Sequence, residues 1–109
     1  MDLEEITIQE EIIKLGEIIR GYLKIPPFNW HFDFETSGYE RKKPYAMCNN
    51  ETNTINVYMK NLIEDKVSKL NIYAIVVHEI VHFLHPDHGH EFEKTWTEIW
   101  LRYISEHRF

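Results

Sequence analysis

Apolar residues recur at helical spacing near the start of the chain. Over residues 9–24 they are Ile12, Leu15, Ile19, Tyr22 and Leu23. This spacing predicts an amphipathic helix with one face against a core. Pro26 and Pro27 then end the helix, because proline lacks a backbone donor and disfavours the helical conformation in the residue before it.

The next stretch has the alternating pattern of strands. Between residues 30 and 35 aromatic and polar residues alternate, in the order Trp30, His31, Phe32, Asp33, Phe34 and Glu35. The alternation predicts a half-buried strand with His31 on its exposed face. Short runs at 44–49 and 54–59, separated by turn-forming residues, predict two more strands. Three successive short strands indicate an antiparallel meander.

An apolar run without glycine or proline follows at residues 72–77. It predicts a buried helix from about Ile72 to Leu84 or His85, with Asn71 as its N-cap. The preceding connection, residues 61–70, has room for a helical turn.

A last helix is expected to begin near His90, after the break at Pro86. Its apolar stripe consists of Phe92, Trp96, Ile99, Trp100 and Tyr103. Such a stripe is typical of packing against another helix. The sequence thus predicts an α+β domain: an N-terminal helix, a three-stranded antiparallel sheet, a central helix and a C-terminal helix.

Length and composition limit the possible classes of protein. The 109 residues predict a single domain, residues 1–109, and contain no apolar run of the length that a transmembrane helix needs. The single Cys48 and an acidic start without a basic leader indicate a reducing, cytoplasmic setting. A net charge of −6 argues against tight, nonspecific nucleic-acid binding.

The candidate chemistry lies in His78-Glu79-Ile80-Val81-His82. Histidines four apart share one helical face, about 6 Å from each other, and can reach one zinc ion. A glutamate directly after the first histidine can act as general base on a zinc-activated water, as in the H-E-x-x-H motif of zinc hydrolases. The sequence therefore predicts zinc on His78 and His82, with Glu79 as the catalytic base.

A catalytic zinc site needs a third protein ligand. His88 follows the break at Pro86, where a turn can bring it back over the ion. His85 lies too far along a straight helix from His78 for both to reach one ion. The remaining alternatives are His90 and the glutamates of the last helix, Glu93, Glu98 and Glu106. The spacing of His78, His82 and His88 equals that of metzincins, but His85 stands where those proteins have glycine.

Two segments resemble small SprT-like and YgjP-like (WLM-related) zinc metallopeptidases. They are residues 77–82, Val-His-Glu-Ile-Val-His, and residues 86–92, Pro-Asp-His-Gly-His-Glu-Phe. They look like the family's H-E-l-x-H motif and the N/D-H-s/g-x-x-F segment that follows it, and the expected α-β-β-β-α-α order is also similar. The resemblance implies zinc on His78, His82 and His88, with Glu79 as base.

We therefore expect a zinc peptidase that holds a protein or peptide substrate along an edge strand by β-augmentation. Tyr45, Tyr103 and His85 are candidates for stabilising the oxyanion. Two non-catalytic alternatives remain open: a zinc-stabilised interaction module, and an antitoxin-like or regulatory binding partner. An open ligand position on the metal would favour catalysis.

Overall fold

The computed structural model of the protein describes residues 3–35 and 44–107, which form four helices and three strands. In chain order the elements are α1 (Leu3–Leu23), β1 (Asn29–Asp33), β2 (Ala46–Asn49), β3 (Thr54–Tyr58), α2 (Met59–Glu64), α3 (Lys69–Val81) and α4 (His90–His107). The expected α+β class is confirmed, and the helical turn for which the connection 61–70 had room is the short helix α2, which begins earlier, at Met59.

The sheet is mixed rather than the antiparallel meander expected from the sequence. Its strand order is β1-β3-β2, so β3 lies in the centre. β1 pairs with β3 in parallel, with Trp30 opposite Ile55, whereas β2 pairs with β3 antiparallel, with Cys48 opposite Ile55. Among the described elements only β2 and β3 form a hairpin, joined by the tight turn at residues 50–53.

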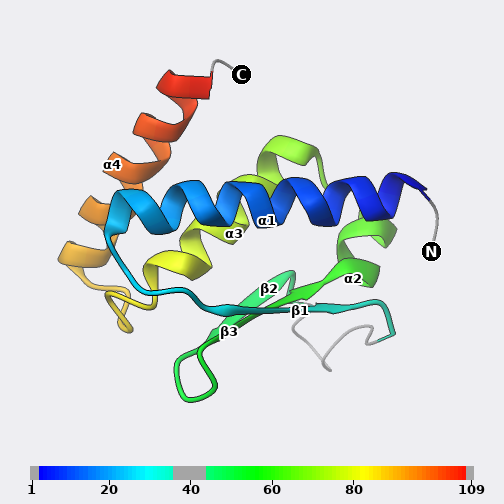
Figure 1. Ribbon diagram of the computed structural model, residues 1–109, viewed down its shortest axis with the longest axis horizontal. Coiled ribbons are helices and arrows are strands. Elements are labelled where there is room, and N and C mark those ends of the chain that lie inside the picture. Colours follow the sequence, from blue (N-terminus) through cyan, green and yellow to red (C-terminus); the bar gives the residue numbers. More distant parts are fainter. Residues whose placement is uncertain (1–2, 36–43, 108–109) are drawn as a thin grey trace.

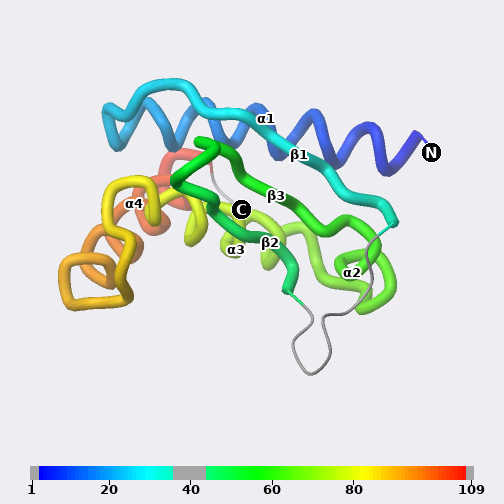
Figure 2. The backbone as a smooth tube through the Cα atoms, turned by 90° about the horizontal axis from the view of Figure 1, so that it is seen from below, coloured from blue at the N-terminus to red at the C-terminus, as the bar shows by residue number. Residues whose placement is uncertain are grey.

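Helices cover one face of this sheet (Figure 1). α1 runs across the molecule above the strands, with α3 beside it, and α4 leads away at the end where α3 finishes. Seen from below, the strands lie in front of α1 and α3 (Figure 2). The arrangement leaves β1 and β2 as the two edges of the sheet.

The core lies between the helices and the covered face of the sheet. It is built from apolar residues of α1, β3, α3 and α4 that are almost completely inaccessible to solvent, and its fully buried members include Ile12, Leu15, Ile19, Ile55, Val57, Val76, Val77, Ile80, Val81 and Phe92. Burying each such side chain contributes about 1.5–3 kcal/mol. α3 is apolar on several sides because it contacts α1, α4 and the sheet.

The helix ends differ from those expected. α1 begins at Leu3 instead of near residue 9, and its first turn carries Glu4 and Glu5, whose charges suit the positive end of a helix dipole. α3 is capped by Ser68, whose hydroxyl accepts a hydrogen bond from the backbone N–H of Asn71. Asn71 is therefore inside the first turn and is not the N-cap.

α3 also ends earlier than expected. Regular α-helix stops at Val81, and the next residues continue as a tighter turn in which His82 and Leu84 donate backbone bonds to carbonyls three residues back. α4 begins at His90, as expected. On α4, Phe92 and Tyr103 are buried, and Trp96, Ile99 and Trp100 pack against the core.

Candidate metal centre

Three histidine side chains converge where α3 ends and the chain turns toward α4. Each of His78, His82 and His88 offers one ring nitrogen, and these nitrogens lie within 4.8 Å of one another. His78 and His82 come from neighbouring turns at the end of α3, while His88 returns over them from the segment after Pro86. Such a group could hold a metal ion.

The spacing of the nitrogens suits a tetrahedral ion. Nε2 of His78 lies 3.2 Å from Nε2 of His88. Two nitrogens bound to zinc at 2.0–2.1 Å in tetrahedral geometry are about 3.3 Å apart. The separation of this pair is therefore compatible with two ligands of one tetrahedral ion. The expected third position, His88, is the one that the fold brings to His78 and His82.

The other candidates for a third ligand lie outside this group of ring nitrogens. Nε2 of His85 is 3.1 Å from Oγ1 of Thr95 on α4, and the carboxylate of Glu106 accepts hydrogen bonds from Tyr22 and Arg102. Among the described residues, the group that could hold a metal includes no glutamate of α4.

The ring of His82 is held by the turn that follows it. Its Nδ1 lies 3.1 Å from the backbone carbonyl oxygen of His85, and because a carbonyl only accepts, Nδ1 must carry the proton. This tautomer leaves the lone pair on Nε2 for a metal, the arrangement in which metal-binding histidines are usually found.

Phe92 lies beneath all three imidazoles. Its ring centroid is 4.8 Å from that of His78, 4.5 Å from that of His82 and 5.0 Å from that of His88. Phe92 is fully buried. Since it lies on the first turns of α4, it couples the position of α4 to the spacing of the three rings.

Glu79 points between the histidines and the sheet. Its Oε1 accepts a 3.0 Å hydrogen bond from the backbone N–H of Cys48 on β2, and its Oε2 lies 3.9 Å from Nε2 of His78. One carboxylate oxygen is thus anchored on the edge strand, while the other faces the place where a metal would be held. A water molecule between that oxygen and a metal would be within reach of both.

The surroundings shift two pKa values in this centre. Burial lowers the pKa of His78, and the nearby His82 and His88 lower it further, which favours the neutral ring whose lone pair can bind a metal. Burial raises the pKa of Glu79, an effect that the bond from Cys48 opposes. A raised pKa suits a group that takes up and returns a proton.

The residues considered for oxyanion stabilisation have partners elsewhere. The hydroxyl of Tyr45 donates to the carboxylate of Asp65, and Tyr103 packs against Tyr73 and His107. Cys48 does not have the character of a nucleophile, because burial and the charge of Glu79 raise the pKa of its thiol to about 12.

Sequence reasoning missed the neighbours of His85 and Glu79. Thr95 on α4 and the backbone N–H of Cys48 on β2 come from elements other than α3. Neither belongs to a motif, and a backbone donor has no signature in the sequence.

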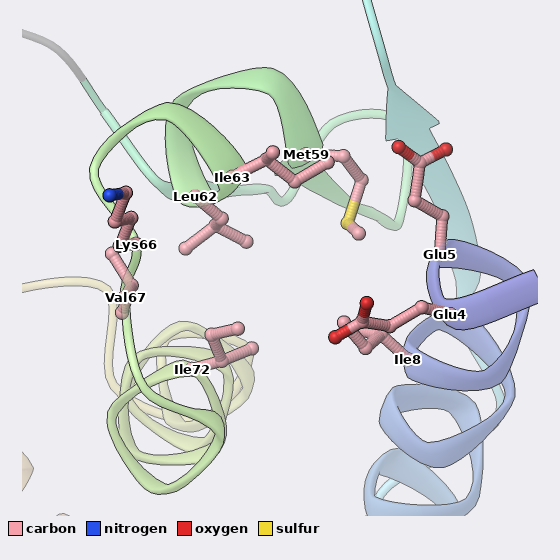
Figure 3. A pocket seen from close by; sticks show the side chains of 9 residues that line it. All are labelled: Glu4, Glu5, Ile8, Met59, Leu62, Ile63, Lys66, Val67 and Ile72. Carbon is pink, nitrogen blue, oxygen red and sulfur yellow. The ribbon is translucent and has the colours of Figure 1, made fainter. Parts of the chain in front are cut away.

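A separate pocket of about 240 Å³ lies at the other end of α3 (Figure 3). It is formed by the start of α1, α2 and the first residues of α3, and its lining side chains are Glu4, Glu5, Ile8, Met59, Leu62, Ile63, Lys66, Val67 and Ile72. Only Glu4 and Glu5 among them belong to residue types that commonly bind a metal. The candidate chemistry is therefore concentrated at the histidines.

No helix in the described parts of the chain is both long enough and apolar enough to cross a membrane.

The chain was compared with known proteins. No protein-family model and no curated protein matches it. Among solved structures, it is similar to the metallopeptidase zymogen jannalysin of Methanocaldococcus jannaschii, with a TM-score of 0.61 and 22% sequence identity. The similarity covers 87% of this chain and 88% of that chain. The chain therefore has a metallopeptidase-like fold, and its three clustered histidines make up a group that could hold a metal ion.

Proposed function

We propose that this protein is a zinc-dependent peptidase in which His78, His82 and His88 hold the ion. The observation that carries the proposal is the convergence of three ring nitrogens within 4.8 Å beside the carboxylate of Glu79. Three imidazole ligands leave a fourth tetrahedral position for water or substrate, which is the arrangement of catalytic rather than structural zinc.

Glu79 supplies the proton chemistry. A zinc ion in this centre would act as a Lewis acid, lowering the pKa of water and polarising the substrate carbonyl. Oε2 of Glu79 faces the ligand nitrogens, so Glu79 takes the proton from the attacking water and returns it to the leaving amine. Its Oε1 stays on the backbone of Cys48, which fixes the direction of the carboxylate.

The substrate binds along the outer edge of β2. In a strand, backbone groups of alternate residues face the same edge. The backbone of Tyr45 faces the neighbouring strand β3, because its carbonyl accepts a hydrogen bond from the N–H of Tyr58. The N–H of Cys48 instead faces the free edge of β2, where it donates to Glu79. The backbone of Ala46 and the carbonyl of Cys48 are thus directed to the edge beside the metal centre, where an extended peptide can add as a further strand, while the N–H of Cys48 stays on Glu79.

This protein is proposed to be a member of the SprT-like and YgjP-like (WLM-related) zinc metallopeptidases that acts in the cytoplasm. Support for the family comes from residues 77–82 and 86–92 and from the place of Phe92 under the three histidines. Support for the compartment comes from the single Cys48.

A non-catalytic, zinc-stabilised interaction module is the second candidate. The bond from the Cys48 N–H to Glu79 favours it, because this bond gives Glu79 a structural reason to be present. Under this alternative the protein holds zinc but cleaves nothing, and the ion lacks an open position.

The test combines metal analysis with a cleavage assay on an unfolded protein such as reduced, alkylated casein. The proposal expects about one zinc per chain, cleavage that a chelator abolishes, and recovery when zinc is added back. Zinc held by four protein ligands without cleavage of any substrate in a broad panel would favour the interaction module. Absence of bound zinc would reject both candidates.

A further inference from the structure

The turn after α3 links one proposed metal ligand to helix α4. Nδ1 of His82 donates to the backbone carbonyl of His85 across 3.1 Å, and Nε2 of His85 lies 3.1 Å from Oγ1 of Thr95 on α4. Both contacts involve His85, the first through its backbone and the second through its ring. His85 therefore joins the ring of His82 to the second turn of α4.

The carbonyl of His85 lies where the backbone hydrogen bonds of this turn end. The N–H of His85 donates to the carbonyl of Val81 at 2.9 Å, but the next residue is Pro86, which has no N–H to donate. The peptide group that carries the His85 carbonyl is therefore not held by a donor of its own. The ring of the same residue is half-buried and contacts Thr95, so it holds this part of the turn from the side of α4.

The hydroxyl of Thr95 suits either tautomer of His85. A neutral imidazole has one nitrogen that donates and one that accepts, and a hydroxyl can do both. The contact therefore does not depend on which nitrogen of His85 carries the proton. Because it engages this ring with α4, the contact is also a reason against His85 as the oxyanion stabiliser considered from the sequence.

We infer that Thr95 is a positioning residue of the metal centre, which acts through His85 to keep His82 in the tautomer and orientation that bind a metal. The inference rests on the proposed metal site and names a further residue that this site needs. An acceptor on Nδ1 fixes the ring of a metal-binding histidine and leaves Nε2 for the ion. Without the hydroxyl of Thr95, the His85 carbonyl still accepts from His82, but its direction is less closely fixed. Zinc binding must then restrict a ring that the parent protein already holds in place.

The first test needs neither zinc nor cleavage. The nitrogen chemical shifts of the His82 ring, assigned by their loss in His82→Gln, show which nitrogen carries the proton in the metal-free protein. They are measured at about pH 8, above the ordinary pKa of histidine. The form with the proton on Nδ1 should predominate in the parent. Thr95→Val keeps the shape of the side chain without the hydroxyl, and it should raise the share of the form with the proton on Nε2, which free histidine prefers.

Two matched variants control this measurement. Thr95→Ser keeps the hydroxyl and should restore the parent tautomer of His82. Thr97→Val makes the same change at an exposed position of α4 and should leave the tautomer unchanged. A role of Thr95 in packing alone would not separate serine from valine in this way.

The second test measures zinc affinity by competition with a chromogenic chelator. Loss of a partner that orients a metal-binding histidine typically weakens binding about 10–100-fold. Thr95→Val should therefore lose at least about tenfold, while Thr95→Ser and Thr97→Val stay near the parent. His85→Ala removes the other half of the same contact and should lose a similar factor, far less than the loss of a ligand such as His88. Combining His85→Ala with Thr95→Val should cost no more than either change alone, since the two side chains make one contact.

The outcomes separate this inference from the peptidase proposal. An unchanged His82 tautomer in Thr95→Val, an equal loss of affinity in Thr95→Val and Thr95→Ser, or losses that add in the double variant would each overturn the positioning role and leave the peptidase intact. If Thr95→Val does not fold, His85→Ala provides the same two measurements. If the parent binds zinc but cleaves nothing, the peptidase proposal fails, and the tautomer and the affinity still decide the role of Thr95. If the parent binds no zinc, the metal centre fails and this inference fails with it.

Discussion

The backbone N–H of Cys48 donates a 3.0 Å hydrogen bond to Oε1 of Glu79, which joins the proposed general base to the edge strand β2. The strand proposed to bind the substrate and the residue proposed to act on it are thus in direct contact. A peptide added to β2 would lie beside the carboxylate from the start. Glu79 therefore has two roles, accepting this hydrogen bond and taking a proton. A glutamine in its place would separate them, because an amide oxygen can accept the same bond but cannot take a proton at neutral pH.

Glu79→Gln should therefore keep the fold and the zinc but lose hydrolysis. The glutamine oxygen can still accept from Cys48, and none of the three histidines is changed. Removal of a general base typically costs about 10²–10⁴-fold in rate. The measurement is cleavage of an unfolded protein by parent and variant, with zinc content and thermal midpoint determined in parallel. Equal cleavage by the two proteins would show that Glu79 is not the base.

His88→Ala should weaken zinc binding far more than His85→Ala. His88 brings its Nε2 to 3.2 Å from that of His78, whereas the ring of His85 faces Thr95. The bond that orients His82 uses the backbone carbonyl of His85, so it survives the alanine substitution. Metal content after dialysis and competition with a chromogenic chelator provide the comparison. The same affinity in the His88→Ala protein and the parent would remove His88 from the ligand set.

Helix α3, which carries His78 and has His82 as its C-cap, could be predicted because its own residues determine both its burial and the spacing of the two histidines. An apolar run places α3 in the core, and the spacing of His78 and His82 puts both on one face. His88 could be proposed because a proline break lets the chain return. The pairing of β1 with β3 could not be predicted, since the residues of β1 give its buried face but not its neighbour in the sheet. The different lengths of connections 34–45 and 50–53 were the one available signal.

The contacts of His85 with Thr95 and of Glu79 with Cys48 were also beyond prediction. Thr95 reaches His85 only because α4 packs across the end of α3, and Cys48 contributes a backbone group rather than its thiol. Such contacts depend on how separate elements come together. Phe92 is an intermediate case: its apolar stripe predicted burial, while its place beneath three imidazoles became visible only in the fold.

Binding to nucleic acid should be weak and sensitive to salt. The net charge of −6 opposes association with a polyanion, and nonspecific affinity depends on counterion release by basic groups. A gel-shift titration with single- and double-stranded DNA at physiological salt is the measurement. Submicromolar affinity under those conditions would contradict this expectation and would make DNA-bound proteins a substrate class to examine.

Glu11 should make stability depend on pH through a contact between α1 and α3. The hydroxyl of Tyr73 donates to its carboxylate at 2.8 Å, and the ammonium of Lys69 lies 3.0 Å from the same oxygen. The hydrogen bond from Tyr73, followed by the contact with Lys69, lowers the pKa of Glu11. A carboxyl group whose pKa is lower in the folded state stabilises the protein above its unfolded pKa, and that stabilisation is lost as the pH falls through the folded value.

Glu11→Gln should accordingly reduce the free energy of unfolding at pH 7, by less than about 1 kcal/mol because the contact is partly exposed. The difference between parent and variant should shrink as the pH is lowered toward about 3, below the ordinary range of glutamate. Denaturant unfolding at several pH values measures it. A difference that stays constant with pH would mean that the charge of Glu11 contributes nothing.

Two glycines of α1 should respond in opposite ways to alanine. Gly16 is buried, and a Cβ there would overlap Cζ2 of Trp30 and lie 2.9 Å from its Cη2. The indole cannot easily move away, because its ring stacks on Phe32 with centroids 5.8 Å apart and contacts Phe28 at 5.2 Å. A Cβ at Gly21 would meet nothing within 4 Å.

Alanine in place of glycine inside a helix gains about 0.5–1 kcal/mol, because glycine loses more backbone freedom on folding. Gly21→Ala should receive this gain in full. At Gly16 the same gain is opposed by overpacking, which typically costs about 1–3 kcal/mol, so Gly16→Ala should destabilise the protein on balance. Denaturant unfolding of the two variants beside the parent gives both signs in one experiment. Stabilisation by Gly16→Ala equal to that by Gly21→Ala would show that Trp30 does not pack against α1 as tightly as described.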